Sequence, residues 1–238
     1  MFDWILDFLF PPACPVCGRY IEQKDGWCSD CLKKLVRPHR LPLDAEMNSL
    51  IDGGVWALGV YEAGLRDVLR RLKYDGRKSL LGGLHGFIGA GLAQVPALSV
   101  PTGTASGGRA GEGPSFCGME NASVAVPVPL HPDRLKERGF NQSELLFREP
   151  FAALGIPMVT ALVRCRSTLP QFGLTAAERS RNMQGAFAVE AGMDLAGRRV
   201  IIADDIMTTG ATLLECARAV RAAGAAGIMG IVAASGRK

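Results

Sequence analysis

Two adjacent carboxylates, Asp204 and Asp205, stand just before a run of small residues, Thr208-Thr209-Gly210-Ala211-Thr212. Carboxylates suit a sugar diol, whose hydroxyls can donate hydrogen bonds to them, or a hydrated Mg²⁺ ion, which prefers oxygen ligands. Hydroxyls and a glycine at a helix start suit a phosphate, because the first helical amides point outward with partial positive charge. The combination predicts a sugar phosphate ligand. The structural alternative is that Asp205 or Thr208 caps the helix and that the acidic pair favours its dipole.

The flanking residues predict the elements that position this pair. Residues 200–203 are apolar and rich in β-branched side chains, which indicates a strand buried on both faces, and we expect the acidic pair to end it. Apolar residues then follow at helical spacing: Leu213, Leu214, Ala217 and Val220. Residues 199–220 are therefore predicted to form strand, loop and helix. The chain has neither the P-loop pattern nor a G-x-G-x-x-G after a strand, so neither of those nucleotide-binding classes is supported.

The composition limits the classes of protein to which this chain can belong. The chain has 238 residues, of which 48% are hydrophobic and 21% charged, as in a globular protein with one main core and a small appendage. The formal charge of +4 is compatible with an anionic ligand but is weak support for nucleic-acid binding. Residues 1–10 are apolar, yet too short to span a bilayer and unlike a signal peptide, so we expect a short amphipathic helix. The expected location is the reducing cytoplasm.

Four of the seven cysteines form two C-x₂-C pairs separated by ten residues: Cys14, Cys17, Cys28 and Cys31. Each pair can present two thiolates to one tetrahedral ion, so the spacing predicts structural Zn²⁺ without an open coordination position. Two disulfides are disfavoured by the expected compartment, and redox C-x-x-C motifs by the lack of a thioredoxin-like pattern.

Basic residues gather in a predicted helix whose apolar positions begin at Leu65; they are Arg66, Arg70, Arg71, Lys73, Arg77 and Lys78. The simpler interpretation is a solvated helix face, and the functional one is a phosphate-binding face. A glycine-rich stretch, residues 97–121, is predicted to be a flexible insertion whose deletion leaves folding intact.

Two further strands are predicted to end in basic residues. Residues 123–130 end in prolines and lead to Arg134, Lys136 and Arg138, which suggests an anion site or, equally, a basic surface helix. Residues 158–163 form the other strand. The polar stretch 171–182 that follows is predicted to be a lid or a plain surface loop, and residues 185–189 resume a strand.

The acidic pair and its loop resemble the 5-phosphoribosyl-1-pyrophosphate (PRPP) signature of type I phosphoribosyltransferases. Nearly the whole chain resembles the competence protein F (ComF) family. The further segments that carry this resemblance are the cysteine pairs, Leu72-Lys73-Tyr74, residues 127–130, residues 138–142 and residues 171–182. The resemblance implies that Asp204 and Asp205 hold the ribose hydroxyls and that residues 208–212 wrap the 5′-phosphate. It also implies that residues 134–142 form the pyrophosphate-side loop, that Lys73 contacts substrate and that residues 171–182 belong to the flexible loop.

The expected fold is a type I phosphoribosyltransferase-like, doubly wound parallel α/β sheet preceded by a small four-cysteine zinc module. Residues 1–40 are assigned to the amphipathic segment and zinc module, and residues 50–238 to the phosphoribosyltransferase-like domain. The strands expected at the centre of the sheet are residues 124–128, 159–163, 200–203 and 228–233.

Two functions are compatible with this pattern. In an enzyme, a nitrogen nucleophile would displace pyrophosphate from PRPP, with Mg²⁺ at the acidic pair and Arg134 or Arg138 at the leaving group. The alternative is a non-catalytic PRPP- or nucleotide-sensing module that binds single-stranded DNA or a DNA-uptake helicase. Aromatic residues for stacking on bases are Trp27, Trp56, Tyr74 and Phe140.

Overall fold

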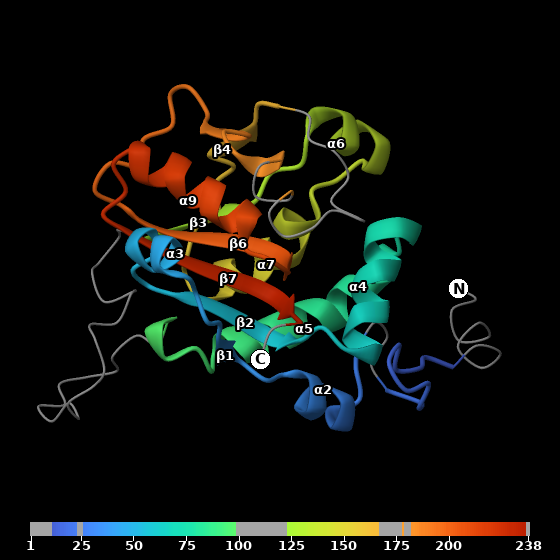
Figure 1. Ribbon diagram of the computed structural model, residues 1–238. Coiled ribbons are helices and arrows are strands. Elements are labelled where there is room, and N and C mark those ends of the chain that lie inside the picture. Colours follow the sequence, from blue (N-terminus) through green and yellow to red (C-terminus); the bar gives the residue numbers. More distant parts are fainter. Residues whose placement is uncertain (1–10, 23–25, 99–122, 167–177, 179–181, 237–238) are drawn as a thin grey trace, which may run out of the picture.

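A five-stranded sheet forms the centre of the molecule (Figure 1), seen in a computed structural model that describes residues 11–22, 26–98, 123–166, 178 and 182–236. Its strand order is β1-β2-β7-β6-β3; β1 is antiparallel to β2, and the other neighbours are parallel. The strands are β1 (His39–Arg40), β2 (Val55–Val60), β3 (Ser123–Pro127), β6 (Arg199–Met207) and β7 (Gly227–Ser235). The predicted parallel sheet is thereby confirmed.

Helices cover both faces of the sheet, as a doubly wound fold requires. Figure 1 shows α3 and α9 on one face and α5 and α7 on the other, while α4 stands beside the strand ends. The α-helices are α2 (Ser29–Leu35), α3 (Ala45–Leu50), α4 (Ala63–Asp75), α5 (Leu81–Leu92), α6 (Pro132–Arg138), α7 (Gln142–Ala153) and α9 (Ala211–Ala222). Two 3₁₀ turns are η1 (Lys78–Leu80) and η2 (Pro96–Leu98).

Alternation along β6 divides its side chains between two hydrophobic cores. Val200 and Ile202 belong to the core beneath α3 and α9, whereas Ile201 and Ala203 belong to the core formed with α4, α5 and α7. Successive side chains of a strand point to opposite faces, so a continuous apolar run is buried on both sides only when helices cover both. The apolar run at residues 200–203 therefore has the environment that the sequence predicts.

The expectation that residues 124–128 and 159–163 lie at the centre of the sheet is wrong, because β3 is its edge strand and none of its strands contains residues 159–163. Met158 makes one isolated bridge to Ala125, after which the chain leaves the sheet edge. The next strand, β4 (Leu162–Arg164), pairs antiparallel with β5 (Phe187–Val189) in a separate two-stranded sheet. Leu162 and Phe187 are buried in the core beneath α9. An apolar run indicates burial but does not specify which strand will be its partner.

Strand β6 does not end at the acidic pair, contrary to expectation. It continues through Asp204 and Asp205 to Met207, and its backbone pairs with β7 as far as Ser235. Ladder hydrogen bonds involve only main-chain groups, so polar side chains at the open end of a sheet do not interrupt them. The acidic pair is consequently held on strand backbone.

Three expectations concern residues outside the described ones: the N-terminal helix at residues 1–10, most of the glycine-rich insertion and most of the stretch 171–182. Within the part of the chain that is described, no helix combines the length and apolar character needed to cross a membrane.

Helix α9 packs closely on the sheet at Gly230 in β7. A Cβ atom at this position would lie 2.5 Å from Leu213 Cδ2 and 2.9 Å from Val55 Cγ2. We expect Gly230→Ala to lower the free energy of unfolding in urea by about 1–3 kcal/mol, because the overpacked core must shift. Gly86→Ala is the matched control, because nothing lies within 4 Å of its Cβ position and alanine favours the helix. Equal effects of the two changes would contradict this packing.

Candidate functional site

The acidic pair lies near the carboxyl end of β6, where three groups stabilise it. Asp204 Oδ1 accepts hydrogen bonds from Ser143 Oγ at 2.9 Å and from the backbone N–H of Asp205 at 2.8 Å. Asp205 Oδ2 lies 3.6 Å from Lys73 Nζ of α4, and both side chains are largely buried, at 14% and 30% exposed. The structure therefore brings together Asp204, Asp205 and Lys73, three residues predicted from sequence, and adds Ser143.

Asp204 has an unusual protonation equilibrium. Burial raises the pKa of its carboxyl to about 7, with a further contribution from the negative charge of Asp205. The hydrogen bonds from Asp205 N–H and Ser143, and the charge of Lys73, act in the opposite direction. The negative charge of Asp205 is also the main cause that raises the pKa of Lys73. A cation or hydrogen-bond donor brought to Asp204 would favour its ionised form.

The loop after β6 opens a helix, as predicted. Gly210 is the N-cap of α9, with φ 90°, and neither Asp205 nor Thr208 has that role. The φ of 90° itself favours glycine, and a Cβ atom at Gly210 would also approach Met207 Cε to 2.8 Å and Met47 Sδ to 2.9 Å. Thr208 is exposed, and Thr209 Oγ1 accepts from the backbone N–H of Ala211 at 3.4 Å. The α9 N-terminus thus lies three residues beyond the strand that carries the carboxylates.

The basic segment after β3 forms helix α6, the structural alternative considered from the sequence. Arg134 is exposed and its Nη1 lies 2.8 Å from Glu137 Oε2, so it is engaged on the helix surface. Arg138 is half-buried, and its positive charge acts against the raised pKa of Lys73, so it lies near that lysine. Of the two arginines predicted from the sequence, Arg138 is the one whose charge acts on Lys73.

The sequence assigned no role to Ser143, and it placed Asn141 and Gln142 in a pyrophosphate-side loop where the structure begins helix α7. Asn141 caps this helix, since its side chain accepts from Ser143 N–H at 3.1 Å, and its Nδ2 donates to the Val128 carbonyl at 3.0 Å. Buried Gln142 donates to the Leu69 carbonyl of α4 at 3.4 Å. An Asn two residues before Ser and ahead of an apolar run is a recognisable N-cap signal. Only the fold reveals that Ser143 meets Asp204.

The four predicted cysteines form one cluster, and their sulfur atoms all lie within 4.8 Å of one another. Cys17 Sγ and Cys28 Sγ are 3.7 Å apart, which matches the separation of about 3.8 Å set by Zn–S bonds of about 2.3 Å in a tetrahedron. Burial acts to raise the pKa of the Cys14 thiol, but backbone hydrogen bonds outweigh it and bring the value to about 6. The donor set fits a closed, structural zinc site.

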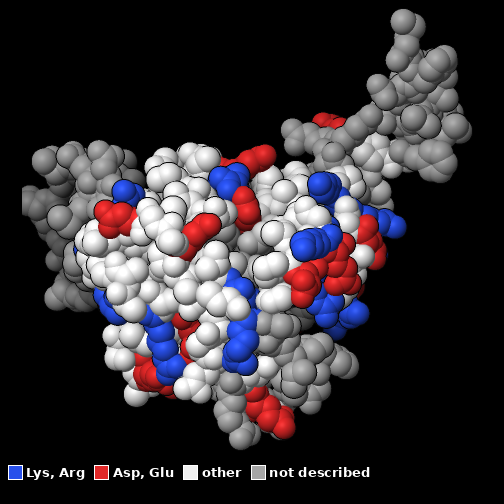
Figure 2. All heavy atoms as spheres, turned by 90° about the horizontal axis from the view of Figure 1, so that it is seen from above, with Lys and Arg blue, Asp and Glu red and all other residues white. Residues whose placement is uncertain are grey.

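The basic residues of α4 project outward around Lys73. Arg66, Arg70 and Arg71 are exposed, and Tyr74 beside them is 70% exposed. Among the described residues visible in Figure 2, Lys and Arg are interspersed with Asp and Glu, so that face shows no broad basic field.

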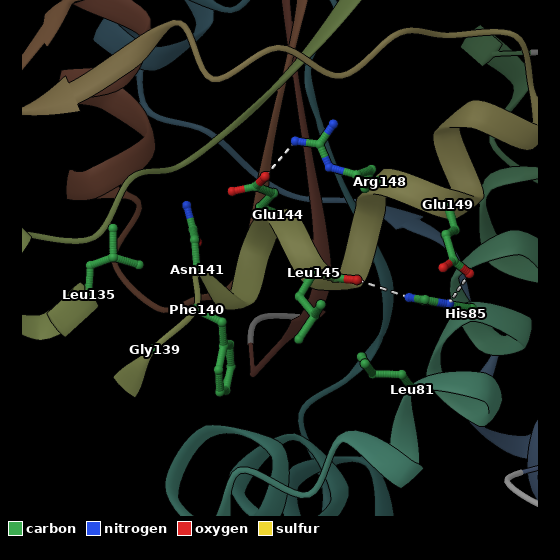
Figure 3. A pocket seen from close by; sticks show the side chains of 10 residues that line it. All are labelled: Leu81, His85, Leu135, Gly139, Phe140, Asn141, Glu144, Leu145, Arg148 and Glu149. Atoms are coloured by element: carbon green, nitrogen blue, oxygen red, sulfur yellow. Dashed lines mark hydrogen bonds and ion pairs between the residues drawn. The ribbon is translucent and has the colours of Figure 1, made fainter. Parts of the chain in front are cut away.

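A pocket of about 380 Å³ lies between α5, the α6–α7 connection and α7 (Figure 3). Figure 3 shows Leu81 and Leu145 pointing toward one another, with Phe140 beside them. Two ion pairs border the pocket, His85 Nδ1 to Glu149 Oε2 at 2.8 Å and Arg148 Nη2 to Glu144 Oε1 at 2.5 Å. Neither carboxylate of the acidic pair lines it. This pocket is thus separate from the candidate site.

Comparison with known proteins identifies the relatives of the chain. It is 37% identical to competence protein F of Haemophilus influenzae over 215 residues, which cover 90% of this chain and 80% of that protein. The chain belongs to the competence protein F family. The DNA utilization proteins YhgH of Escherichia coli and Salmonella typhimurium are both 29% identical to it, over 90% of this chain and 80% and 86% of their lengths.

Two domain families match parts of the chain. Residues 5–42 match the double zinc ribbon domain, which agrees with the four-cysteine zinc site. Residues 152–238 match the phosphoribosyl transferase domain, a segment that includes β6, the acidic pair and α9. Lys73 and Ser143, which contact the acidic pair, precede this match in the sequence.

The raised pKa of Asp204 predicts how stability depends on pH. Between the unfolded pKa of about 3.9 and about 7, the folded protein keeps a proton that the unfolded chain has released, so stability falls as pH rises through this window. Asp204→Asn should reduce this decline and raise the free energy of unfolding at pH 8 by about 1–3 kcal/mol. Urea unfolding from pH 4.5 to 8 measures it. Exposed Asp75→Asn is the control, and the same pH slope in wild type and Asp204→Asn would contradict the prediction.

Proposed function

We propose that the chain binds PRPP together with Mg²⁺ at the carboxyl end of β6. The observation that carries the proposal is the placement of two consecutive carboxylates on strand backbone, with Asp205 six residues before the first residue of α9. Ligands of open α/β sheets bind at the carboxyl ends of strands, and helix N-termini bind phosphates. The match to the phosphoribosyl transferase domain over residues 152–238 supports the same ligand class.

Each part of PRPP has a proposed partner. Asp204 and Asp205 accept hydrogen bonds from the ribose hydroxyls and hold hydrated Mg²⁺, for which carboxylate oxygens are suitable ligands. The loop at residues 208–212 and the first amides of α9 hold the 5′-phosphate, and Gly210 permits the close backbone approach. Lys73 and Arg138 supply positive charge for the pyrophosphate, after Lys73 exchanges its contact with Asp205 for the ligand.

The reaction that this arrangement supports is transfer of the phosphoribosyl group to a nitrogen nucleophile. The bond between C1 and the pyrophosphate oxygen breaks as the C1–N bond forms, and the proton of the acceptor N–H passes to solvent. The chain contributes positioning and charge neutralisation, since Lys73 and Arg138 stabilise the developing negative charge. Mg²⁺ would supply further positive charge to the leaving group.

We also propose a role in DNA uptake or utilization. The relatives that cover most of the chain are named a competence protein and DNA utilization proteins. A second candidate function therefore is binding of single-stranded DNA, with a DNA-uptake helicase as a possible partner class. The supporting observation is the exposed face of α4, which places Arg70 and Arg71 beside Tyr74. Backbone phosphates bind cations, and bases stack on exposed aromatic rings.

PRPP binding predicts a rise in the thermal midpoint. A ligand at a hundredfold excess over its Kd stabilises the native state by about 2.7 kcal/mol, which is a shift of about 2–4 °C for a chain of this size. We expect that shift with PRPP and Mg²⁺ together and none in Asp204→Asn/Asp205→Asn. Asp67→Asn, an exposed aspartate of α4, is the control that removes a charge away from the site. A shift that persists in the double variant would exclude the acidic pair as the binding site.

DNA binding by the α4 face predicts a different pattern. Arg70→Ala/Arg71→Ala should weaken binding of an oligo-dT probe in fluorescence anisotropy and lower the salt slope by about 1 for each lost phosphate contact. Lys33→Ala/Lys34→Ala, which removes the same charge from exposed positions of α2, should leave binding unchanged. Equal losses in both variants would indicate nonspecific attraction, and binding that survives Asp204→Asn/Asp205→Asn would separate this function from PRPP binding.

A further inference from the structure

The zinc module packs directly on the start of helix α4. Val16 lies between the zinc ligands Cys14 and Cys17, and it packs against the core that contains the apolar side of α4. A Cβ atom added at Gly64, the second residue of α4, would lie 2.3 Å from Val16 Cγ1. The module therefore rests on the helix backbone itself, and glycine is required for this approach.

A second contact joins the module to helix α5. Trp27, the residue before Cys28, stacks on Phe87 with ring centroids 5.5 Å apart and an interplanar angle of 27°. Phe87 is fully buried in the same core as Leu65, Leu69 and other apolar residues of α4. Trp27 Nε1 is buried, and the described residues supply no acceptor for it. The module is thus held by the fit of apolar surfaces, which depends on the shape of the module.

The other end of α4 meets the acidic pair. Lys73 lies 3.6 Å from Asp205, and the Leu69 carbonyl accepts the hydrogen bond from Gln142, the neighbour of Ser143. Ser143 in turn donates to Asp204. Nine residues at a rise of 1.5 Å separate Gly64 from Lys73, so the two contacts are about 14 Å apart on one rigid element.

Helix α4 is held by its buried inner side, where Leu65, Val68, Leu69 and Leu72 pack in the main core, and by the zinc module at its N-terminal end. In Figure 1 it stands beside the strand ends rather than across the middle of the sheet, with the zinc module at its N-terminal end. Its outer residues, including Arg66, Arg70 and Arg71, are exposed. Its first residue has no side-chain cap, since Glu62 makes no capping hydrogen bond. The apolar contacts at its inner side therefore decide where Lys73 lies.

We propose that the zinc-loaded module positions α4 so that Lys73 reaches Asp205, and that zinc occupancy thereby controls the acidic pair as a ligand site. The small core of the module consists of Cys14, Ile21 and Cys31, of which two are zinc ligands. Such a core cannot persist without the metal. When the ligands separate, Val16 and Trp27 lose their fixed places and α4 loses the support at its N-terminal end.

The positioning of Lys73 can be measured without any ligand, by mass-spectrometric quantification of lysine acylation in the full-length protein. An ion-paired, partly buried amine reacts slowly, so Lys73 should be labelled several-fold more slowly than exposed Lys33 and Lys78. Gly64→Ala should raise labelling of Lys73 several-fold while Lys33 and Lys78 are unchanged and zinc content is kept. Removal of zinc with a chelator should raise it as well.

The double variant makes the test specific. Val16→Ala removes Cγ1, the atom nearest to the new Cβ, and leaves Val16 Cβ at 3.3 Å, so it should restore slow labelling of Lys73 in the Gly64→Ala background. Gly89→Ala in α5, where nothing lies within 4 Å, is the control for a helical glycine. Unchanged Lys73 labelling in both Gly64→Ala and the chelated protein would overturn the proposal. A uniform rise at all lysines would do so too, because it would indicate unfolding.

The proposal that zinc controls the ligand site rests on the proposed PRPP function, and it is tested separately by measuring PRPP binding. Gly64→Ala should weaken PRPP binding in the presence of Mg²⁺ about tenfold, and Val16→Ala should restore it. Wild-type protein that does not bind PRPP would refute the proposed function, while the labelling of Lys73 would still decide the positioning by zinc. If Gly64→Ala labelled Lys73 quickly but kept full PRPP affinity, the proposed control of the ligand site by zinc would be refuted.

Discussion

Two carboxylates on consecutive residues of a central strand must be stabilised against burial and against each other. Asp204 has the hydrogen bond from Ser143 and the amide of Asp205, and Asp205 has Lys73. These partners come from three separate elements, α7, β6 and α4, so the packing of both helices on the sheet is tied to the charge of the pair. The compensation is incomplete, since the pKa of Asp204 remains raised to about 7. A site that keeps such a charge penalty is suited to a ligand that brings donors and a cation.

Close approach of backbones is the second constraint on this region. Gly230 lets α9 pack on β7, and Gly210 lets the chain turn from β6 into α9 beside Met207 and Met47. At Gly64 the zinc module approaches α4 in the same way. In each place a missing Cβ atom allows one element to fix the position of another. The sheet, the loop after β6 and the zinc module are thus linked by close contacts at glycines.

Local signals in the sequence predict a large part of this architecture. The order strand, loop and helix over residues 199–220 follows from an apolar run, a glycine and helical spacing, all of which act within a few residues. The four cysteines are equally local, because zinc fixes their spacing. The comparison with known proteins confirms the family that these motifs indicate.

The features that the sequence does not reveal depend on contacts between distant segments. The partner of residues 162–164 is chosen by burial beneath α9, which an apolar run cannot specify. The end of β6 is set by pairing with β7, so two acidic residues remain in strand conformation. The contacts of Asp204 with Ser143 and of Asp205 with Lys73 join residues 61 and 132 positions apart. The family resemblance named Lys73, but only the folded chain shows that it contacts Asp205 and that Ser143 contacts Asp204.

The central claim is that the acidic pair and the α9 N-terminus together hold a phosphoribosyl ligand. Phosphorus-31 NMR of PRPP with Mg²⁺ and the protein tests it most directly, because the 5′-phosphate and the pyrophosphate give separate resonances. The account predicts that substoichiometric wild-type protein broadens and shifts the 5′-phosphate resonance, through exchange with a site at the helix N-terminus. Spectra identical with and without the protein, in a zinc-loaded and folded sample, would contradict it.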